Sequence, residues 1–316
     1  MSTDLPSTDP AQKPAVDPTQ GAAPAGESAQ GAAPAAAYAS PAGAHVRLDC
    51  DAFHPQADRL AVRRDGDLVI VELADHDRRN MMGLEMTAAW GRLMTDIAAD
   101  TDVRAVLVTG QGTAFSSGGN TSWIGADSHE PVPVLRERML AYYRTWLMIR
   151  DLPMPTIAAI NGPAIGAGAA LALACDVRWA GASASMSVPF LRMGMHPGML
   201  STYLLTEVAG VAAARDLLFT GRRVAAQEML SLGLASRVLP DDELEAAALV
   251  GAHGVAAGAP VAVRLTKVAL RDGGPASWAD ATQWEGLAQA VTLASDDLAE
   301  GLAAVREKRP AHFTGR

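Results

Sequence analysis

Short apolar runs alternate with stretches of helical periodicity along most of this chain. Leu60–Arg64 and Leu68–Leu73 flank the sequence Asp-Gly-Asp, and two strand-like runs around Asp-Gly predict a β-hairpin. Ala105–Thr109 and Thr156–Ile160 are uninterrupted runs with the length and composition of a buried strand. The pattern therefore predicts a sheet with buried inner strands.

Helical spacing of apolar residues occurs between and after these runs. It covers Met81 to about Ala99, Val132 to about Ile149, Ala169–Ala174, Met199–Val208, Val211–Leu218, Ala225–Leu230 and Asp242–Ala256. We expect one more short strand at Val177–Ala180, and helix from Pro260 to about Lys308. Alternating strands and helices followed by helices alone predict an α/β core with a helical C-terminal segment.

The start of the chain differs in composition from the rest. Residues 1–44 are dominated by Ala, Pro, Gly, Ser, Thr and Gln, with few bulky apolar side chains. Such a segment buries too little surface to offset its conformational entropy, so we expect a disordered tail. The expected organisation is this tail, a core over residues 45–258 in which the fold begins near Arg59, and a C-terminal segment over residues 259–316.

Composition narrows the class of protein. The 316 residues are 49% hydrophobic and carry a formal net charge of −9, with no dense basic run, which argues against a nucleic-acid partner. Cys50 and Cys175 lack the spacing of metal ligands or of a disulfide framework, so we expect no metal site and a reducing compartment. No apolar run reaches about 18 residues, and the first residues do not resemble a secretory signal. We therefore expect a cytoplasmic protein without a membrane partner.

Two loops rich in small residues follow buried strands. Residues 114–120 are Ala-Phe-Ser-Ser-Gly-Gly-Asn, and residues 161–170 are Asn-Gly-Pro-Ala-Ile-Gly-Ala-Gly-Ala-Ala. Glycine permits close backbone approach, and the first N–H groups of a helix lack intrahelical partners and carry partial positive charge. Each loop alone is more typical of an ordinary tight turn. Together, facing one point, they would hold a carbonyl oxygen that gains negative charge.

With further motifs, these loops resemble the enoyl-CoA hydratase/isomerase (crotonase) superfamily. The other motifs are Cys175–Arg178, Gly194–Gly198, Phe219–Gly221, Gly233–Val238 and Glu307–Arg309, and the order and spacing match over roughly Leu60 to Phe313. The resemblance implies a crotonase-like spiral of repeated ββα units with a helical C-terminal oligomerisation segment. It also implies an acyl-CoA substrate, no cofactor other than the CoA of that substrate, and a homotrimer or a dimer of trimers.

The resemblance implies roles for individual residues. The two backbone N–H groups of the family's oxyanion hole belong here to Gly119 and Ala167, and they would stabilise a thioester enolate. Residues expected to border the substrate are Ser117, Gly118, Trp123, Gly166, Phe190, Gly198 and Tyr203, with Lys308 approaching CoA from a neighbouring subunit. For Trp123 and Tyr203, plain packing is the alternative.

The chain departs from the family where hydratases carry acids. Ala170 and Phe190 stand at the positions of the two glutamates, and Gly198 stands where other branches have an aspartate. Neither Ala170 nor Phe190 can transfer a proton, so the two-glutamate mechanism is not available. His196 is the candidate acid or base because histidine titrates near neutrality. A histidine that packs under its loop is the alternative.

Three functions remain open at this stage. The first is an acyl-CoA-processing enzyme of the hydratase/isomerase type, a lyase or isomerase, with a proton carrier other than glutamate. The second keeps the oxyanion hole for isomerisation, C–C cleavage, decarboxylation or thioester hydrolysis. The third is a catalytically silent acyl-CoA-binding or assembly subunit.

Overall fold

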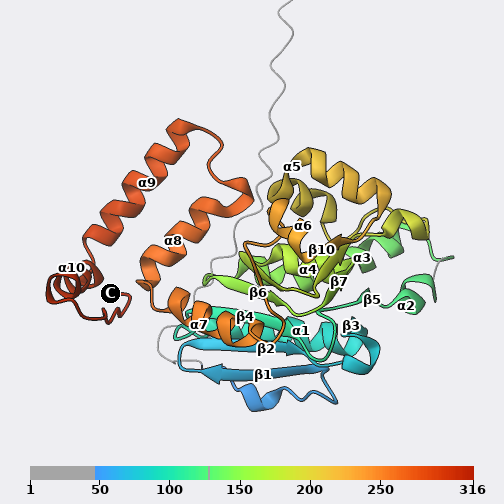
Figure 1. The fold of residues 1–316 in the computed structure, drawn as a ribbon, viewed down its shortest axis with the longest axis horizontal. Helices are drawn as coiled ribbons and strands as arrows, with labels where there is room; N and C mark the ends of the chain where they lie inside the picture. The colour runs from blue at the N-terminus through green and yellow to red at the C-terminus, as the bar shows by residue number, and fades with distance from the viewer. Residues whose placement is uncertain (1–46, 127–128) are drawn as a thin grey trace, which may run out of the picture. The chain divides into compact units, whose positions relative to one another are not determined.

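The computed structural model describes residues 47–126 and 129–316, and the tail expected over residues 1–44 lies outside them. Within the described residues, the main sheet has the strand order β1-β2-β4-β6-β8-β11 (Figure 1). The strands are β1 Leu60–Asp65, β2 Leu68–Leu73, β4 Ala105–Gly110, β6 Thr156–Ile160, β8 Val177–Gly181 and β11 Arg237–Leu239. The predicted hairpin and the predicted buried strands are confirmed.

The chain repeats one unit: a strand of the main sheet, a short strand of a second layer, then a helix. The short strands are β3 Met81–Met82, β5 Gly118–Gly119, β7 Pro163–Ile165 and β9 Ser185–Ser187, joined by β10 Val224–Ala225. The helices that follow them are α1 Leu84–Ala99, α2 Thr121–Ala126 with α3 Val132–Asp151, α4 Ala167–Ala174 and α5 Ser201–Thr220. This is the expected spiral of ββα units.

Alternation along the central strands divides the core into two faces. In β2, Leu68 and Ile70 contact the cluster built on α7, which spans Leu244–Ala256, whereas Val69 and Val71 contact the larger cluster on the opposite face. β1 pairs with β2 in antiparallel orientation. All other neighbouring strands of the main sheet, from β2 through β4, β6 and β8 to β11, pair in parallel. Because both faces are covered, the inner strands are mostly apolar, and polar side chains such as Glu72, Thr109 and Arg178 are only partly buried.

Several element boundaries differ from the sequence expectation. Met81 and Met82 form strand β3, so the helix expected from Met81 begins only at Leu84. The two helices expected around residues 199–218 are assigned as α5 with a break at Gly210, where φ is +75°. The packed fold also begins before Arg59, because Leu48 and Phe53 are buried in the core.

The C-terminal segment is helical, as expected, but it contains turns. After α6 Ala226–Ser231 and α7, it forms α8 Pro260–Leu270, α9 Trp278–Leu293 and α10 Asp296–Glu307. Gly273 and Gly274 have positive φ and separate α8 from α9. In Figure 1 these helices lie on the side of the molecule away from β5 and α2.

No single helix within residues 47–126 and 129–316 is long and apolar enough to cross a membrane. Among these residues, one pair of consecutive helical segments, Leu244–Ala256 and Pro260–Gly273, has the length and apolar composition of a membrane span when the two are taken together. The two segments are bent by 104° relative to each other.

Candidate active site

The two small-residue loops lie against each other, backbone to backbone. The N–H of Ser116 donates to the carbonyl oxygen of Pro163 at 3.2 Å, and the N–H of Ile165 donates to that of Ser116 at 2.9 Å. A Cβ atom at Gly118 would clash with the Ile165 carbonyl and lie 3.1 Å from the amide nitrogen of Ala167. Glycine at 118, with φ of +88°, is therefore what lets the first loop reach the second.

The second loop ends at the N-terminus of α4. Gly166 has φ of +56°, and its N–H donates to the carbonyl oxygen of Ser187 at 2.8 Å. Ala167 is the first residue of α4, so its N–H has no acceptor within the helix. The partial positive charge of the helix N-terminus adds to that unpaired donor. This end of α4 suits an oxygen that carries negative charge.

Gly119 lies in β5, paired in parallel with Met82 of β3. A Cβ atom added at Gly119 would stand 3.6 Å from the hydroxyl oxygen of Tyr142 and 3.3 Å from Ile124. The Tyr142 hydroxyl donates to the carbonyl oxygen of Met82 at 3.2 Å, and burial raises the pKa of Tyr142. A protonated tyrosine on α3 thus packs behind the first loop.

Trp123 belongs to an aromatic cluster on this side of the core. Its ring centroid lies 5.3 Å from that of Tyr142, and the guanidinium of Arg138 lies 5.0 Å from its centroid. The cluster continues through Trp146, which stacks on Trp90 at 4.9 Å. Trp123 is half-buried, which is compatible with either a pocket wall or simple packing.

Two asparagines that the sequence analysis did not assign to the site hold the first loop in place. Asn80 is fully buried and donates to the carbonyl oxygens of Gln111 and Ala114, and the Ser116 hydroxyl donates to its carbonyl oxygen. Asn161 bonds the backbone of Gly110 through both amide atoms. An asparagine beside a strand end is the only sequence feature that could have identified them.

Ala170 and Phe190, the positions at which the sequence resemblance predicts the acids of hydratases, are apolar and buried. Ala170 has no exposed surface, and its N–H donates to the carbonyl oxygen of Gly166 within α4. Phe190, in a 3-10 turn over Phe190–Met193, places Cζ 3.7 Å from where a Cβ of Gly166 would stand. The wall beside the N-terminus of α4 is therefore hydrocarbon at these two positions.

The remaining predicted site residues differ in exposure and in their hydrogen-bond partners. His196 is exposed, and no hydrogen bond or ion pair of the described residues involves it. Ser117 is exposed, and its hydroxyl donates to the Arg78 carbonyl oxygen at 3.2 Å. Tyr203 is 42% exposed, and its hydroxyl donates to Asp272 at 3.2 Å. Gly198 is buried against Tyr143.

Lys308 lies far from the loops of its own chain. It is the C-cap of α10, in a left-handed conformation, and α10 lies on the opposite side of Figure 1 from β5. Within one chain it does not reach the oxyanion-hole candidates. Its expected contact with CoA therefore depends on a neighbouring subunit.

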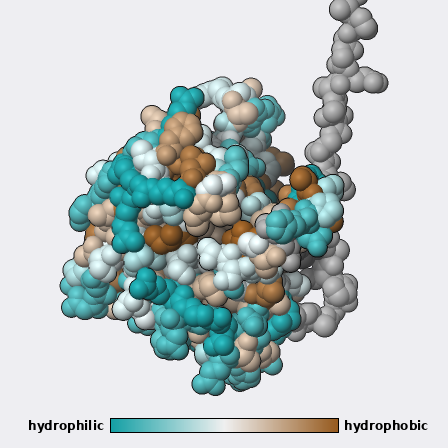
Figure 2. Space-filling model, turned by 90° about the vertical axis from the view of Figure 1, so that its right-hand side faces the viewer, coloured by the Kyte–Doolittle hydropathy of each residue, from teal (hydrophilic) through white to brown (hydrophobic). Residues whose placement is uncertain are grey.

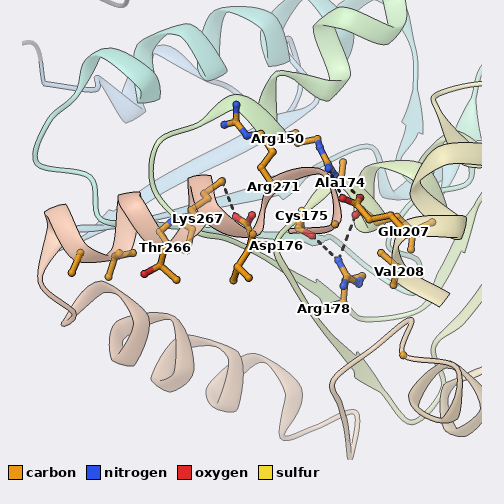
Figure 3. Close-up of a pocket in the computed structure, with 17 residues that line it drawn as sticks. Arg150, Ala174, Cys175, Asp176, Arg178, Glu207, Val208, Thr266, Lys267 and Arg271 are labelled. Carbon is orange, nitrogen blue, oxygen red and sulfur yellow. Dashed lines mark hydrogen bonds and ion pairs between the residues drawn. The ribbon is translucent and has the colours of Figure 1, made fainter. Parts of the chain in front are cut away.

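A cavity of about 650 Å³ lies elsewhere, between the carboxyl end of α4 and α8 (Figure 3). Lys267 donates to the Met154 carbonyl oxygen and pairs with Asp176 at 2.7 Å, while Arg150 forms two hydrogen bonds with Glu207. Burial raises the pKa of Cys175 to about 12, so this thiol stays protonated. Because these charged side chains of the cavity pair with one another, they are suited to a structural role in holding α8 against the core.

Figure 2 shows the side of the molecule on which β3, β5 and α2 lie, and apolar side chains are exposed there among hydrophilic ones.

Within the described part of the chain, no group of three or more His, Cys, Asp or Glu residues is arranged to hold a metal ion.

Most of the chain is similar in sequence to known proteins of one family. The model of the family "Enoyl-CoA hydratase/isomerase" matches residues 63–316. A putative enoyl-CoA hydratase of Thermus thermophilus is 36% identical over 248 residues, which cover 78% of this chain and 98% of that protein.

Solved structures of enoyl-CoA hydratases have a similar fold. A putative enoyl-CoA hydratase from Streptomyces coelicolor superposes with a TM-score of 0.79 at 32% identity, covering 88% of this chain and 100% of that one. An enoyl-CoA hydratase from Bacillus anthracis has a TM-score of 0.76 at 32% identity, covering 82% and 100%.

Proposed function

Since this chain belongs to the enoyl-CoA hydratase/isomerase family, we propose that it acts on acyl-CoA thioesters and stabilises a thioester enolate between Gly119 and Ala167. The observation that carries the proposal is the approach of the two loops, with Gly118 against the amide of Ala167. CoA enters as part of the substrate, and no other cofactor is proposed.

The chemistry follows from where negative charge develops. Removal of a proton from the carbon beside the thioester carbonyl moves charge onto the carbonyl oxygen. Two backbone N–H groups and the N-terminus of α4 stabilise that charge more than they stabilise the neutral carbonyl. The hole thereby lowers the barrier for any reaction that passes through an enolate.

We propose His196 as the proton carrier, because the positions of Ala170 and Phe190 hold no titratable group. His196 lies in the loop that begins at Phe190, and Phe190 borders Gly166. Its side chain is exposed and has no partner among the described residues, so it is free to turn toward a bound acyl group. The reaction would be that of a lyase or an isomerase.

A second function has its own support. The hydrocarbon at Ala170 and Phe190 is what a catalytically silent acyl-CoA-binding subunit would carry at these positions. Such a subunit would bind thioesters through the same two loops without turnover.

Binding and turnover separate these functions. We expect crotonyl-CoA and butyryl-CoA to bind in calorimetry, and crotonyl-CoA to be converted in a chromatographic assay. His196→Gln should keep binding and lower turnover about 100-fold, whereas His54→Gln, an exposed histidine outside both loops, should not. Binding without any turnover would favour the silent subunit, and absence of binding would overturn the proposal.

We also propose that the chain assembles as a homotrimer or a dimer of trimers through its C-terminal helices. None of the residues of α9, all of which the structure describes, is buried. Leu287, Val291 and Leu293 of α9 and Leu302 and Val305 of α10 are exposed apolar side chains. A second copy of the chain would remove this apolar surface from water.

A further inference from the structure

The hydroxyl group of Tyr143 occupies the space that a side chain at position 198 would need. A Cβ atom built on Gly198 would stand 2.5 Å from the Tyr143 hydroxyl oxygen and 3.2 Å from Cζ. Both distances are shorter than ordinary van der Waals contact, and Gly198 is buried. Glycine at 198 therefore allows the tyrosine of α3 to lie against this loop.

This hydroxyl has a hydrogen to donate. Burial raises the pKa of Tyr143, and a backbone hydrogen bond from Met199 opposes that rise only in part, so the phenol is protonated near neutral pH. In the hydrogen bonds of residues 47–126 and 129–316, the Tyr143 O–H finds no acceptor.

The surroundings of Tyr143 connect it to both halves of the oxyanion hole. The preceding residue, Tyr142, packs behind Gly119. On the other side, the loop that carries Gly198 begins at Phe190, whose ring lies beside Gly166, and the Met195 N–H donates to the Phe190 carbonyl oxygen at 3.1 Å. Tyr143 thus stands where α3 meets the loop that borders the N-terminus of α4.

We propose that the Tyr143 hydroxyl donates a hydrogen bond to an oxygen on the acyl chain, and so selects thioesters that carry a hydroxyl group beyond the carbonyl. The inference rests on the proposed function, because it needs the thioester to sit between the two loops. The chemistry follows from the side chains present: Ala170 and Phe190 offer only hydrocarbon, while the Tyr143 hydroxyl, which lies against Gly198, offers a donor. An oxygen on the acyl chain would give the half-buried Tyr143 hydroxyl an acceptor.

Binding measurements test this without knowledge of the reaction. Dissociation constants of butyryl-CoA, 3-hydroxybutyryl-CoA and 4-hydroxybutyryl-CoA would be measured by calorimetry. We expect at least one hydroxybutyryl-CoA to bind the wild type about three- to tenfold more tightly than butyryl-CoA. Tyr143→Phe should abolish that preference and leave butyryl-CoA affinity within about twofold.

Two further variants make the result specific. Gly198→Ala displaces the same hydroxyl from the opposite side and should also remove the preference, even if Tyr143→Phe were to fold poorly. Tyr142→Phe removes a hydroxyl that already donates to the Met82 carbonyl oxygen, so this variant should retain the preference for hydroxybutyryl-CoA. Equal binding of all three thioesters by the wild type, or a preference that survives in Tyr143→Phe, would overturn the inference. Failure to bind any thioester would instead refute the proposed function.

Discussion

Single glycines decide whether the two loops of the candidate site can meet. Gly118 and Gly168 both lie where a side chain would enter the backbone or side chain of the other loop, at Ile165 and Ser116 respectively. The sequence places glycines in both loops, but it does not indicate which of them faces the partner loop. Only the contact between segments far apart in the chain makes that distinction.

Replacing Gly118 with alanine should separate the loops. The added Cβ would clash with the Ile165 carbonyl, and a positive φ is unfavourable for alanine, so we expect a loss of about 1–3 kcal/mol in unfolding free energy. Acyl-CoA binding should weaken at least tenfold in calorimetry.

Gly254→Ala is the matched control for that change. No atom lies within 4 Å of a Cβ at Gly254, which is inside α7, so alanine there should be neutral or slightly stabilising. Equal affinity of Gly118→Ala and wild type would contradict the role of the Gly118 contact.

Asp100 is a second residue whose importance comes from its partners. It is buried and accepts hydrogen bonds from Arg64 and from the N–H groups of Leu48 and Asp102. Burial acts to raise the pKa of Asp100, but these hydrogen bonds outweigh it, so the pKa lies below its ordinary value. A lowered pKa means that the charged form stabilises the fold above the unfolded-state pKa of about 3.9 and that this contribution is lost as pH falls.

Asp100→Asn should therefore lower the unfolding free energy by about 3 kcal/mol at pH 7, because Arg64 loses its buried partner. The difference from wild type should shrink as pH falls below about 4. Denaturant unfolding at several pH values measures it, with the exposed Asp102→Asn as control. A difference that does not change with pH would rule out the charge of Asp100 as its cause.

At the scale of elements, local pattern predicted most helices and strands, and the exceptions have physical reasons. Met81 and Met82 have helical spacing with the residues after them, yet they pair with Gly118 and Gly119 as β3 and β5. Tertiary pairing with a distant loop overrides local periodicity there. The same applies to Tyr143: helical periodicity predicts its helix, but it does not show which side chain meets Gly198.

A charge pair between the buried Lys267 and the more exposed Asp176 joins α8 to the core. Lys267 pairs with Asp176, which also accepts hydrogen bonds from the N–H and hydroxyl of Thr156 at the start of β6. Lys267→Met should leave Asp176 without its cation and lower the unfolding free energy by about 1.5–2 kcal/mol in denaturant unfolding. Arg215→Met, at an exposed position, should change it by less than about 0.5 kcal/mol. Comparable losses in both variants would show that the pair does not fasten α8.

At the scale of the whole molecule, the C-terminal helices expose apolar surface that the other described residues do not cover. We expect Leu287→Glu together with Val291→Glu to convert the assembly to monomers, because two charges would be buried in the proposed contact. Light scattering after gel filtration measures the mass. Gln289→Glu adds a charge to the same exposed helix outside the apolar set and should leave the oligomer intact. A monomeric wild type would refute the assembly proposal.

The sequence by itself determined the hairpin, the buried strands, the two loops of small residues, and the absence of acids at Ala170 and Phe190. These features depend on residue type and local spacing, which a sequence displays directly. The tertiary structure decided that the two loops lie against each other, that Asn80 and Asn161 hold the first loop, and that Tyr143 fills the space at Gly198. Each of these is a contact between segments distant in the chain, and packing in three dimensions sets which side chains meet.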